Sequence, residues 1–140
     1  RSYDKNFHIV IFDRAIFDGV ARMEYYRDKG IITEDQQRVI EGYLLLRWNR
    51  NLFDLHVCMT CDTGVAIDRE LARALIKKHG QTMNPTTLRE LQEAHARLWR
   101  RLDCAKDPRM LWHDTTSENE AQTANIVLDA ILSACERRPL

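Results

Sequence analysis

The sequence lacks the features of several large functional classes. No apolar run approaches the roughly 20 residues needed to cross a bilayer, and no internal repeat or low-complexity segment is present. The 21 basic residues balance the 21 acidic ones, so charge gives no reason to expect nucleic acid or a membrane as a partner. No serine lies in the glycine-flanked elbow of a Ser-His-Asp hydrolase.

Cysteine is also scarce, with four residues in the chain. Such sparse thiols indicate a reducing, cytoplasmic compartment. Cys58 and Cys61 have C-x-x-C spacing, but a redox motif normally opens a helix and a zinc site needs a second pair. This pair lies along a predicted strand, where positions i and i+3 point to opposite faces. We therefore interpret both cysteines as structural, with metal or redox use as the alternative.

Hydrophobic periodicity predicts strands that alternate with helices. The strands are expected at residues 7–13, 53–61 and 110–113, and the helices at residues 15–29, 33–49, 65–78, 84–102 and from Ser117 onward. This order predicts one α/β domain over residues 1–140, with a parallel sheet and helices on both faces.

Several helix boundaries have clear sequence signals. Thr33 to Gln36 and Ser117 to Glu120 have the pattern of capping boxes. Asn84-Pro85 is a strong helix start, and Gly30 is expected to end the first helix. His95 lies on an apolar helix face, which favours a packing role.

Each predicted strand ends in polar residues, where parallel α/β sheets bind ligands. The first strand ends in Asp13-Arg14. A carboxylate after an apolar run is typical of Mg²⁺ binding beside a nucleotide phosphate, and an arginine can clamp a phosphate with two hydrogen bonds. In the alternative interpretation, Asp13 caps the next helix and Arg14 pairs with an acid. The spacing alone favours neither.

Three segments resemble one enzyme family. IFDRAIFDGVAR resembles the D-R-[YFS]-x-x-S-x-x-A segment of P-loop nucleoside and nucleotide kinases of the thymidylate kinase and deoxynucleoside kinase type. FDLHVCMTCDTGVAIDRELAR is similar to their P-D-L-x-[IV]-x-L-x-x-x-P-E-x-A-x-x-R segment, and WHDTTSENEAQTANIVLDAIL resembles their final strand, adenine-side loop and closing helix. The segments cover most of the chain in the family's order.

The resemblance implies a P-loop NTPase-like three-layer sandwich that uses ATP and Mg²⁺. It implies that Asp13 lies near the metal or the acceptor hydroxyl, and that Arg14 holds a phosphoryl group. Arg69 and Arg73 would act from a lid-like region at about residues 65–101, although an exposed basic face is the alternative. The resemblance also implies an acceptor side and an adenine side, formed respectively by Phe17, Asp18 and Arg22 and by Asp114, Thr115 and Thr116.

The sequence departs from this family in two ways. Ala15, Asp18 and Arg22 replace residues that are usual there, which does not suit a thymine pocket. No Walker A loop, G-x-x-x-x-G-K-[ST], is present among the five glycines. In the family that loop follows the central strand of the sheet, so the strands of this chain would lack their central neighbour. We expect this chain to be the C-terminal portion of a longer protein and to be inactive alone. The alternatives are that another chain supplies the central strand, or that the fold differs.

Three functional hypotheses remain open at this stage. The first is phosphoryl transfer from ATP to a small nucleoside-like or nucleotide-like acceptor. The second is a P-loop NTPase that regulates or drives a partner. The third is a non-enzymatic α/β interaction module in which Asp13 and Arg14 are structural. A homodimer is a further expectation, whereas nucleic acid and membrane partners are not expected.

Overall fold

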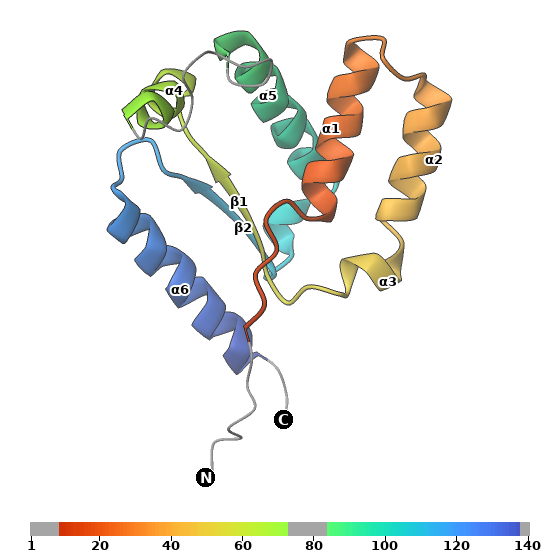
Figure 1. Cartoon of the computed structure of the whole chain (residues 1–140). Coiled ribbons are helices and arrows are strands. Elements are labelled where there is room, and N and C mark those ends of the chain that lie inside the picture. The colour runs from red at the N-terminus through yellow and green to blue at the C-terminus, as the bar shows by residue number, and fades with distance from the viewer. Residues whose placement is uncertain (1–8, 73–83, 138–140) are drawn as a thin grey trace.

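The structure is a computed structural model, and it describes residues 9–72 and 84–137. At its centre, strand β1 (His56–Thr60) pairs in parallel with strand β2 (Met110–Asp114). Helix α6 (Glu120–Glu136) runs along one side of this pair, and helices α1 (Ile16–Asp28) and α5 (Pro85–Arg101) run along the other (Figure 1). The predicted α/β class with a parallel sheet is confirmed, with a small sheet of two strands in the described residues.

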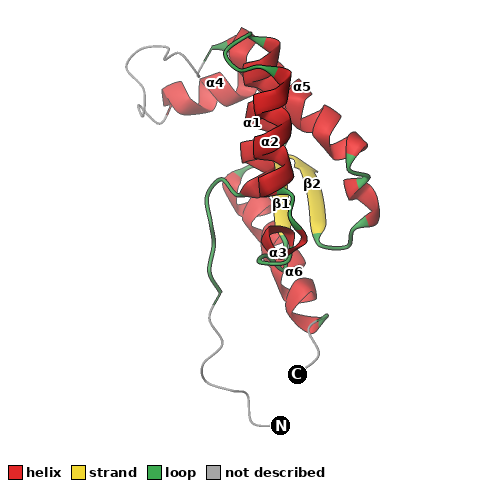
Figure 2. Ribbon diagram, turned by 90° about the vertical axis from the view of Figure 1, so that its right-hand side faces the viewer, coloured by secondary structure: helices red, strands yellow, loops and turns green. Residues whose placement is uncertain are grey.

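The predicted first strand is wrong over its described part. Residues 9–13 form no ladder with another strand, and the side chains of residues 9–12 are between 52% and 79% exposed. Figure 2 draws the segment as a loop. A β-strand needs a hydrogen-bonded neighbour, and none of the described strands pairs with this segment. The ring of Phe12 packs against that of Phe53, with centroids 5.5 Å apart. The apolar pattern of a buried strand is present, but the neighbouring strand is not.

The helical signals near the N-terminus are largely confirmed. Gly30 adopts a positive φ of 68° directly after α1, and the capping box of Thr33 and Gln36 opens helix α2 (Glu34–Leu44). The predicted helix to residue 49 is interrupted, because helix α3 (Arg47–Arg50) starts separately. Where α2 ends, the Tyr43 carbonyl accepts from the Asn49 side chain at 2.7 Å and from the Leu46 N–H at 3.3 Å.

The later helices start at side-chain caps. Helix α4 (Thr63–Ala72) follows Asp62, whose carboxylate accepts from the N–H groups of Gly64 and Val65, and its predicted continuation to residue 78 lies outside the described residues. Asn84 caps α5 as predicted. The predicted cap at Ser117 is wrong, because Asn119 and Gln122 form the capping box of α6. A short 3₁₀ helix, η1 (Cys104–Lys106), precedes β2.

The core lies where α1 crosses α5. Val20 and Ala21 of α1 pack against Ala94 and Leu98 of α5, and these mostly small side chains let the two helices approach closely. None of the helices in the described part of the chain is long and apolar enough to span a membrane.

An ion-pair network surrounds this core. Glu24 is buried, and its carboxylate meets Arg101 at 2.8 Å and Arg97 at 3.5 Å. Arg101 also bonds Glu41 of α2. Arg97 and Arg101 therefore tie α5 to α1, and Arg101 also ties it to α2.

Candidate active site

A cavity of about 1630 Å³ opens between β1, the segment before α1, and the helices α5 and α6. It brings together residues that the sequence predicted from distant segments: Asp13, Arg14, Phe17, Asp18, Arg22, Arg69 and Thr115. Asp114 and Thr116 belong to the predicted site but do not line the cavity. Arg73, predicted as a lid residue, lies outside the described residues.

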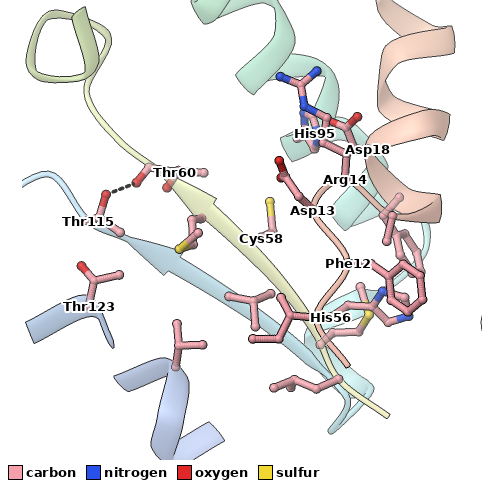
Figure 3. Close-up of a pocket in the computed structure, with 18 of the residues that line it drawn as sticks. Phe12, Asp13, Arg14, Asp18, His56, Cys58, Thr60, His95, Thr115 and Thr123 are labelled. Carbon is pink, nitrogen blue, oxygen red and sulfur yellow. Dashed lines mark hydrogen bonds and ion pairs between the residues drawn. The ribbon is translucent and has the colours of Figure 1, made fainter. Parts of the chain in front are cut away.

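Asp13 and Arg14 lie at the end of the extended segment, beside α1 (Figure 3). Asp13 does not cap α1, since the N-cap is Ala15 and it has no side-chain capping bond. Within residues 9–72 and 84–137, the Asp13 carboxylate has no hydrogen-bond or ion-pair partner. Arg14 has a φ of 62°, a left-handed conformation that costs a non-glycine residue about 1–2 kcal/mol. Strain of this kind is concentrated at functional sites. The alternative in which Asp13 caps the helix is not supported, because α1 has no side-chain cap.

Asp18 is the centre of a charged cluster on the same wall of the cavity. Its carboxylate lies 3.6 Å from His95 Nε2 and 3.5 Å from Arg22 Nε. The contact with His95, helped by the charges of Arg22 and Arg14 and opposed by burial, holds the pKa of Asp18 below its ordinary value. Asp18 is therefore a carboxylate at neutral pH, able to accept hydrogen bonds from a ligand.

His95 is the residue that sequence reasoning missed. Its Nδ1 lies 2.8 Å from the Leu91 carbonyl, and its Nε2 faces the Asp18 carboxylate at 3.6 Å. The packing interpretation holds only in part, because the ring also lines the cavity. No sequence signal marks this contact, since α1 and α5 are far apart in the chain and meet only in the fold.

Arg69 organises the carboxyl ends of the two strands. Its Nη2 donates to the carbonyls of Thr115 at 2.8 Å and Glu118 at 2.7 Å, with Thr116 at 3.3 Å. Its Nη1 lies 3.4 Å from Cys61 Sγ. The alternative of an exposed basic face is wrong for Arg69, because its guanidinium is occupied by the loop after β2. It positions the predicted adenine-side residues, Thr115 and Thr116.

The same rim is cross-linked by hydroxyl groups. Thr115 Oγ1 donates to the Thr60 carbonyl at 3.0 Å, as drawn in Figure 3. Thr116 Oγ1 donates to Asp114 at 2.5 Å and accepts from the Asp62 N–H at 2.8 Å. The hydrogen bonds from Thr116 hold the pKa of Asp114 below its ordinary value. Asp114 and Thr116 therefore stabilise the turn beside the cavity, and Thr115 reaches it.

Cys58 projects from β1 toward Asp13 (Figure 3). Burial, with the nearby charge of Asp18, raises the pKa of the Cys58 thiol to about 11. A protonated thiol is a poor nucleophile and metal ligand, and Cys58 and Cys61 are both free thiols. These properties favour the structural interpretation of Cys58.

A magnesium ion would have one protein carboxylate at this site. Within the described part of the chain, no three histidine, cysteine or acidic side chains are grouped to hold a metal. Mg²⁺ beside a nucleotide commonly uses only one or two carboxylates, with waters and phosphate oxygens as its other ligands. The unpartnered Asp13 carboxylate suits that mode of binding, and an all-protein metal cage does not fit these residues.

Comparisons with known proteins give no independent assignment. No protein-family model, no curated protein and no solved structure matches this chain. The functional argument therefore depends on the site itself.

Proposed function

We propose that this chain forms part of a P-loop kinase-like phosphotransferase, which moves the γ-phosphoryl group of ATP to a small nucleoside-like or nucleotide-like acceptor. One observation carries the proposal: a single cavity is lined both by the Asp13-Arg14 pair and by the Arg69–Thr115 rim. Enzymatic phosphoryl transfer depends mainly on positioning and on charge stabilisation. This cavity is lined by the acidic side chains of Asp13 and Asp18 and by the basic side chains of Arg14, Arg22 and Arg69.

Each group has a role in this proposal. Arg14 offers donors to phosphate oxygens, and Asp13 holds Mg²⁺ or orients the acceptor hydroxyl. Asp18 and Arg22 bind polar groups of the acceptor, beside the ring of Phe17. Mg²⁺, when bound, neutralises charge on the transferred phosphoryl group.

The adenine side of the proposed site is the loop after β2. Thr115 lines the cavity there, and Arg69 keeps that loop against α4 through bonds to the Thr115 hydroxyl and carbonyl. The phosphate loop that this class of enzyme requires is absent from the sequence. The proposal therefore requires that polypeptide outside these 140 residues supplies the loop, as part of a larger three-layer sandwich. The 140-residue chain alone is expected to be inactive.

The test is acceptor-dependent release of ADP by the protein in its natural form. Nucleosides and nucleoside monophosphates are supplied with Mg-ATP, and ADP is measured for the wild type, Asp13→Asn and Asp35→Asn. Asp35 is exposed on α2, away from the cavity, so its variant is a matched control. We expect Asp13→Asn to lower turnover by about 10²-fold or more and Asp35→Asn to leave it unchanged.

Other results would identify a different function. Release of ADP at the same rate with and without each acceptor would indicate an NTPase that acts on a partner. Equal turnover by Asp13→Asn and wild type would refute the site assignment. Absence of Mg-ATP binding would leave the chain as an interaction module.

A further inference from the structure

The Asp18 carboxylate is held from two helices. On α1 itself, Arg22 Nε lies 3.5 Å from Asp18 Oδ2, a contact between side chains one helical turn apart. From α5, His95 Nε2 lies 3.6 Å from Asp18 Oδ1. The three side chains are between 22% and 27% exposed, so solvent screens these contacts only in part. Each carboxylate oxygen therefore has its own neighbour, and the neighbour from α5 is His95.

The imidazole of His95 is anchored at its other nitrogen as well. Its Nδ1 lies 2.8 Å from the Leu91 carbonyl, one turn earlier in α5. The partner of one ring nitrogen determines how the other nitrogen is presented. Contacts at both nitrogens therefore fix the plane of the ring, which lies beside Asp18 in the wall of the cavity (Figure 3).

The core fixes the backbone positions of both residues. Ala94, which precedes His95, is fully buried. It packs against Val20 and Ala21, in the turn of α1 that follows Asp18. Groups carried by rigid, packed elements keep their geometry better than groups on loops. The contact between Asp18 and His95 is therefore formed before any ligand binds.

We infer that His95 is a positioning residue, which holds the Asp18 carboxylate ready to accept a hydrogen bond from a hydroxyl or amino group of the acceptor. This inference rests on the proposed function. The contact with His95 is the largest cause that holds the pKa of Asp18 below its ordinary value, so the same contact keeps the carboxylate charged and oriented. Arg69, and not His95, holds the loop on the proposed adenine side. Loss of His95 should therefore affect binding of the acceptor and not binding of ATP.

The first measurement tests the contact without reference to any activity. The pKa of the Asp18 carboxyl is measured by NMR in the wild type, His95→Phe and His56→Phe, each in the protein's natural form. Phenylalanine keeps an aromatic ring at each position and removes both nitrogens. His56 also lines the cavity but is not among the groups that shift the pKa of Asp18, so its variant is a matched control. The pKa of Asp18 should rise in His95→Phe and stay the same in His56→Phe.

The second measurement compares the KM of the acceptor with the KM of ATP. The probe is the nucleoside or nucleoside monophosphate that gives the fastest release of ADP by the wild type. We expect His95→Phe to raise the KM of this acceptor about tenfold, since a misplaced carboxylate loses a hydrogen bond of a charged group, and to leave the KM of ATP unchanged. His56→Phe should leave both constants unchanged.

Two further substitutions of His95 separate positioning from packing. His95→Gln should recover most of the acceptor KM, because the glutamine amide can donate at the place of Nε2. His95→Asn removes the group at Nε2 but can still donate to the Leu91 carbonyl. It should give the same rise in the pKa of Asp18 and in the acceptor KM as His95→Phe, and it replaces that variant if phenylalanine prevents folding.

The outcomes distinguish this inference from the proposed function. A wild type without acceptor-dependent release of ADP would overturn both. An active wild type, with the same acceptor KM in His95→Phe and His56→Phe, would overturn the positioning role alone. Equal increases in both Michaelis constants, without recovery in His95→Gln, would show that His95 only packs. An unchanged pKa of Asp18 in His95→Phe would show that the two side chains are not in contact.

Discussion

The guanidinium of Arg69 is bonded to the Glu118 carbonyl at 2.7 Å, which joins α4 to the loop after β2. The same group holds the carbonyls of Thr115 and Thr116. These carbonyls precede α6, so one side chain fixes the loop that connects the sheet to its covering helix. Arg69 is therefore a positioning residue for the candidate site.

Replacing Arg69 by lysine should destabilise the protein. An ammonium group cannot reproduce the planar set of donors that reaches several carbonyls at once. We expect Arg69→Lys to lower the free energy of unfolding by about 1–3 kcal/mol, measured by urea denaturation. Arg38→Lys is the control, because Arg38 makes an exposed pair with Glu34 and should change stability by less than about 0.5 kcal/mol. Equal effects of the two substitutions would show that the Arg69 contacts are not formed.

The buried carboxylate of Glu24 should contribute more to the stability of the fold than exposed carboxylates do. It faces Arg97 and Arg101 at the α1–α5 contact, and glutamine would remove its charge while keeping its size. We expect Glu24→Gln to cost about 1–3 kcal/mol, since both partners are partly exposed and can turn to solvent. Glu34→Gln, at an exposed pair, should cost less than about 0.5 kcal/mol. A Glu24 variant as stable as the Glu34 variant would contradict the network.

His56 should make stability depend on pH. Burial, and then the positive charge of Arg109, lowers the pKa of His56 to about 4, whereas an unfolded histidine titrates near about 6.5. Between these values the unfolded chain binds a proton that the folded chain does not. The contribution of His56 to stability is therefore fully present above about pH 6.5 and is lost as the pH falls toward about 4.

Replacing His56 by phenylalanine should remove this dependence. Phenylalanine keeps the ring contacts with Phe17 and Phe53 and removes Nε2, which is buried without a hydrogen-bond partner in the described residues. Urea denaturation at pH 7 and pH 5 should show a smaller loss of stability on acidification for His56→Phe than for the wild type. The same loss in both proteins would contradict the burial of this histidine.

Replacement by alanine should have opposite effects on stability at two of the glycines. Gly30 has a positive φ of 68°, and Gly42 lies inside α2, with open space around an added Cβ at both positions. Gly30→Ala should cost about 1–2 kcal/mol because of the left-handed backbone. Gly42→Ala should stabilise by about 0.5–1 kcal/mol because alanine is the better helix former. Thermal unfolding of the two variants measures both signs, and destabilisation by Gly42→Ala would be evidence against an ordinary α2.

Local signals in the sequence predicted much of the fold. Asn84, Thr33 and Gly30 act through bonds to residues within a few positions, so their patterns mark helix ends without tertiary information. The two strands of the sheet were predicted for a similar reason, from short apolar runs. The predicted cap at Ser117 is wrong because Asn119 caps α6 instead, and the Gln122 side chain completes that capping box.

Features that depend on distant partners were harder to predict. Residues 9–12 have the composition of a buried strand, but strand formation requires a neighbour that the sequence pattern does not reveal. The contact of His95 with Asp18, and the arginine pairs of Glu24, exist only because α1 crosses α5. The sequence placed Asp13 and Thr115 on one rim because it predicted that both follow strands of one parallel sheet. Both residues line one cavity, but residues 9–13 pair with no described strand, so that reasoning does not account for the position of Asp13.

The most direct test of the proposed nucleotide site is to map the residues at which Mg-ATP binds. Amide chemical shifts of the protein in its natural form should be recorded during titration with Mg-ATP. The largest changes are predicted at Arg14 and Thr115 and their sequence neighbours, on the two sides of the cavity. Shifts that cluster instead around Gln37 and Glu41, in the groove between α1 and α2, or no shifts at all, would contradict the account.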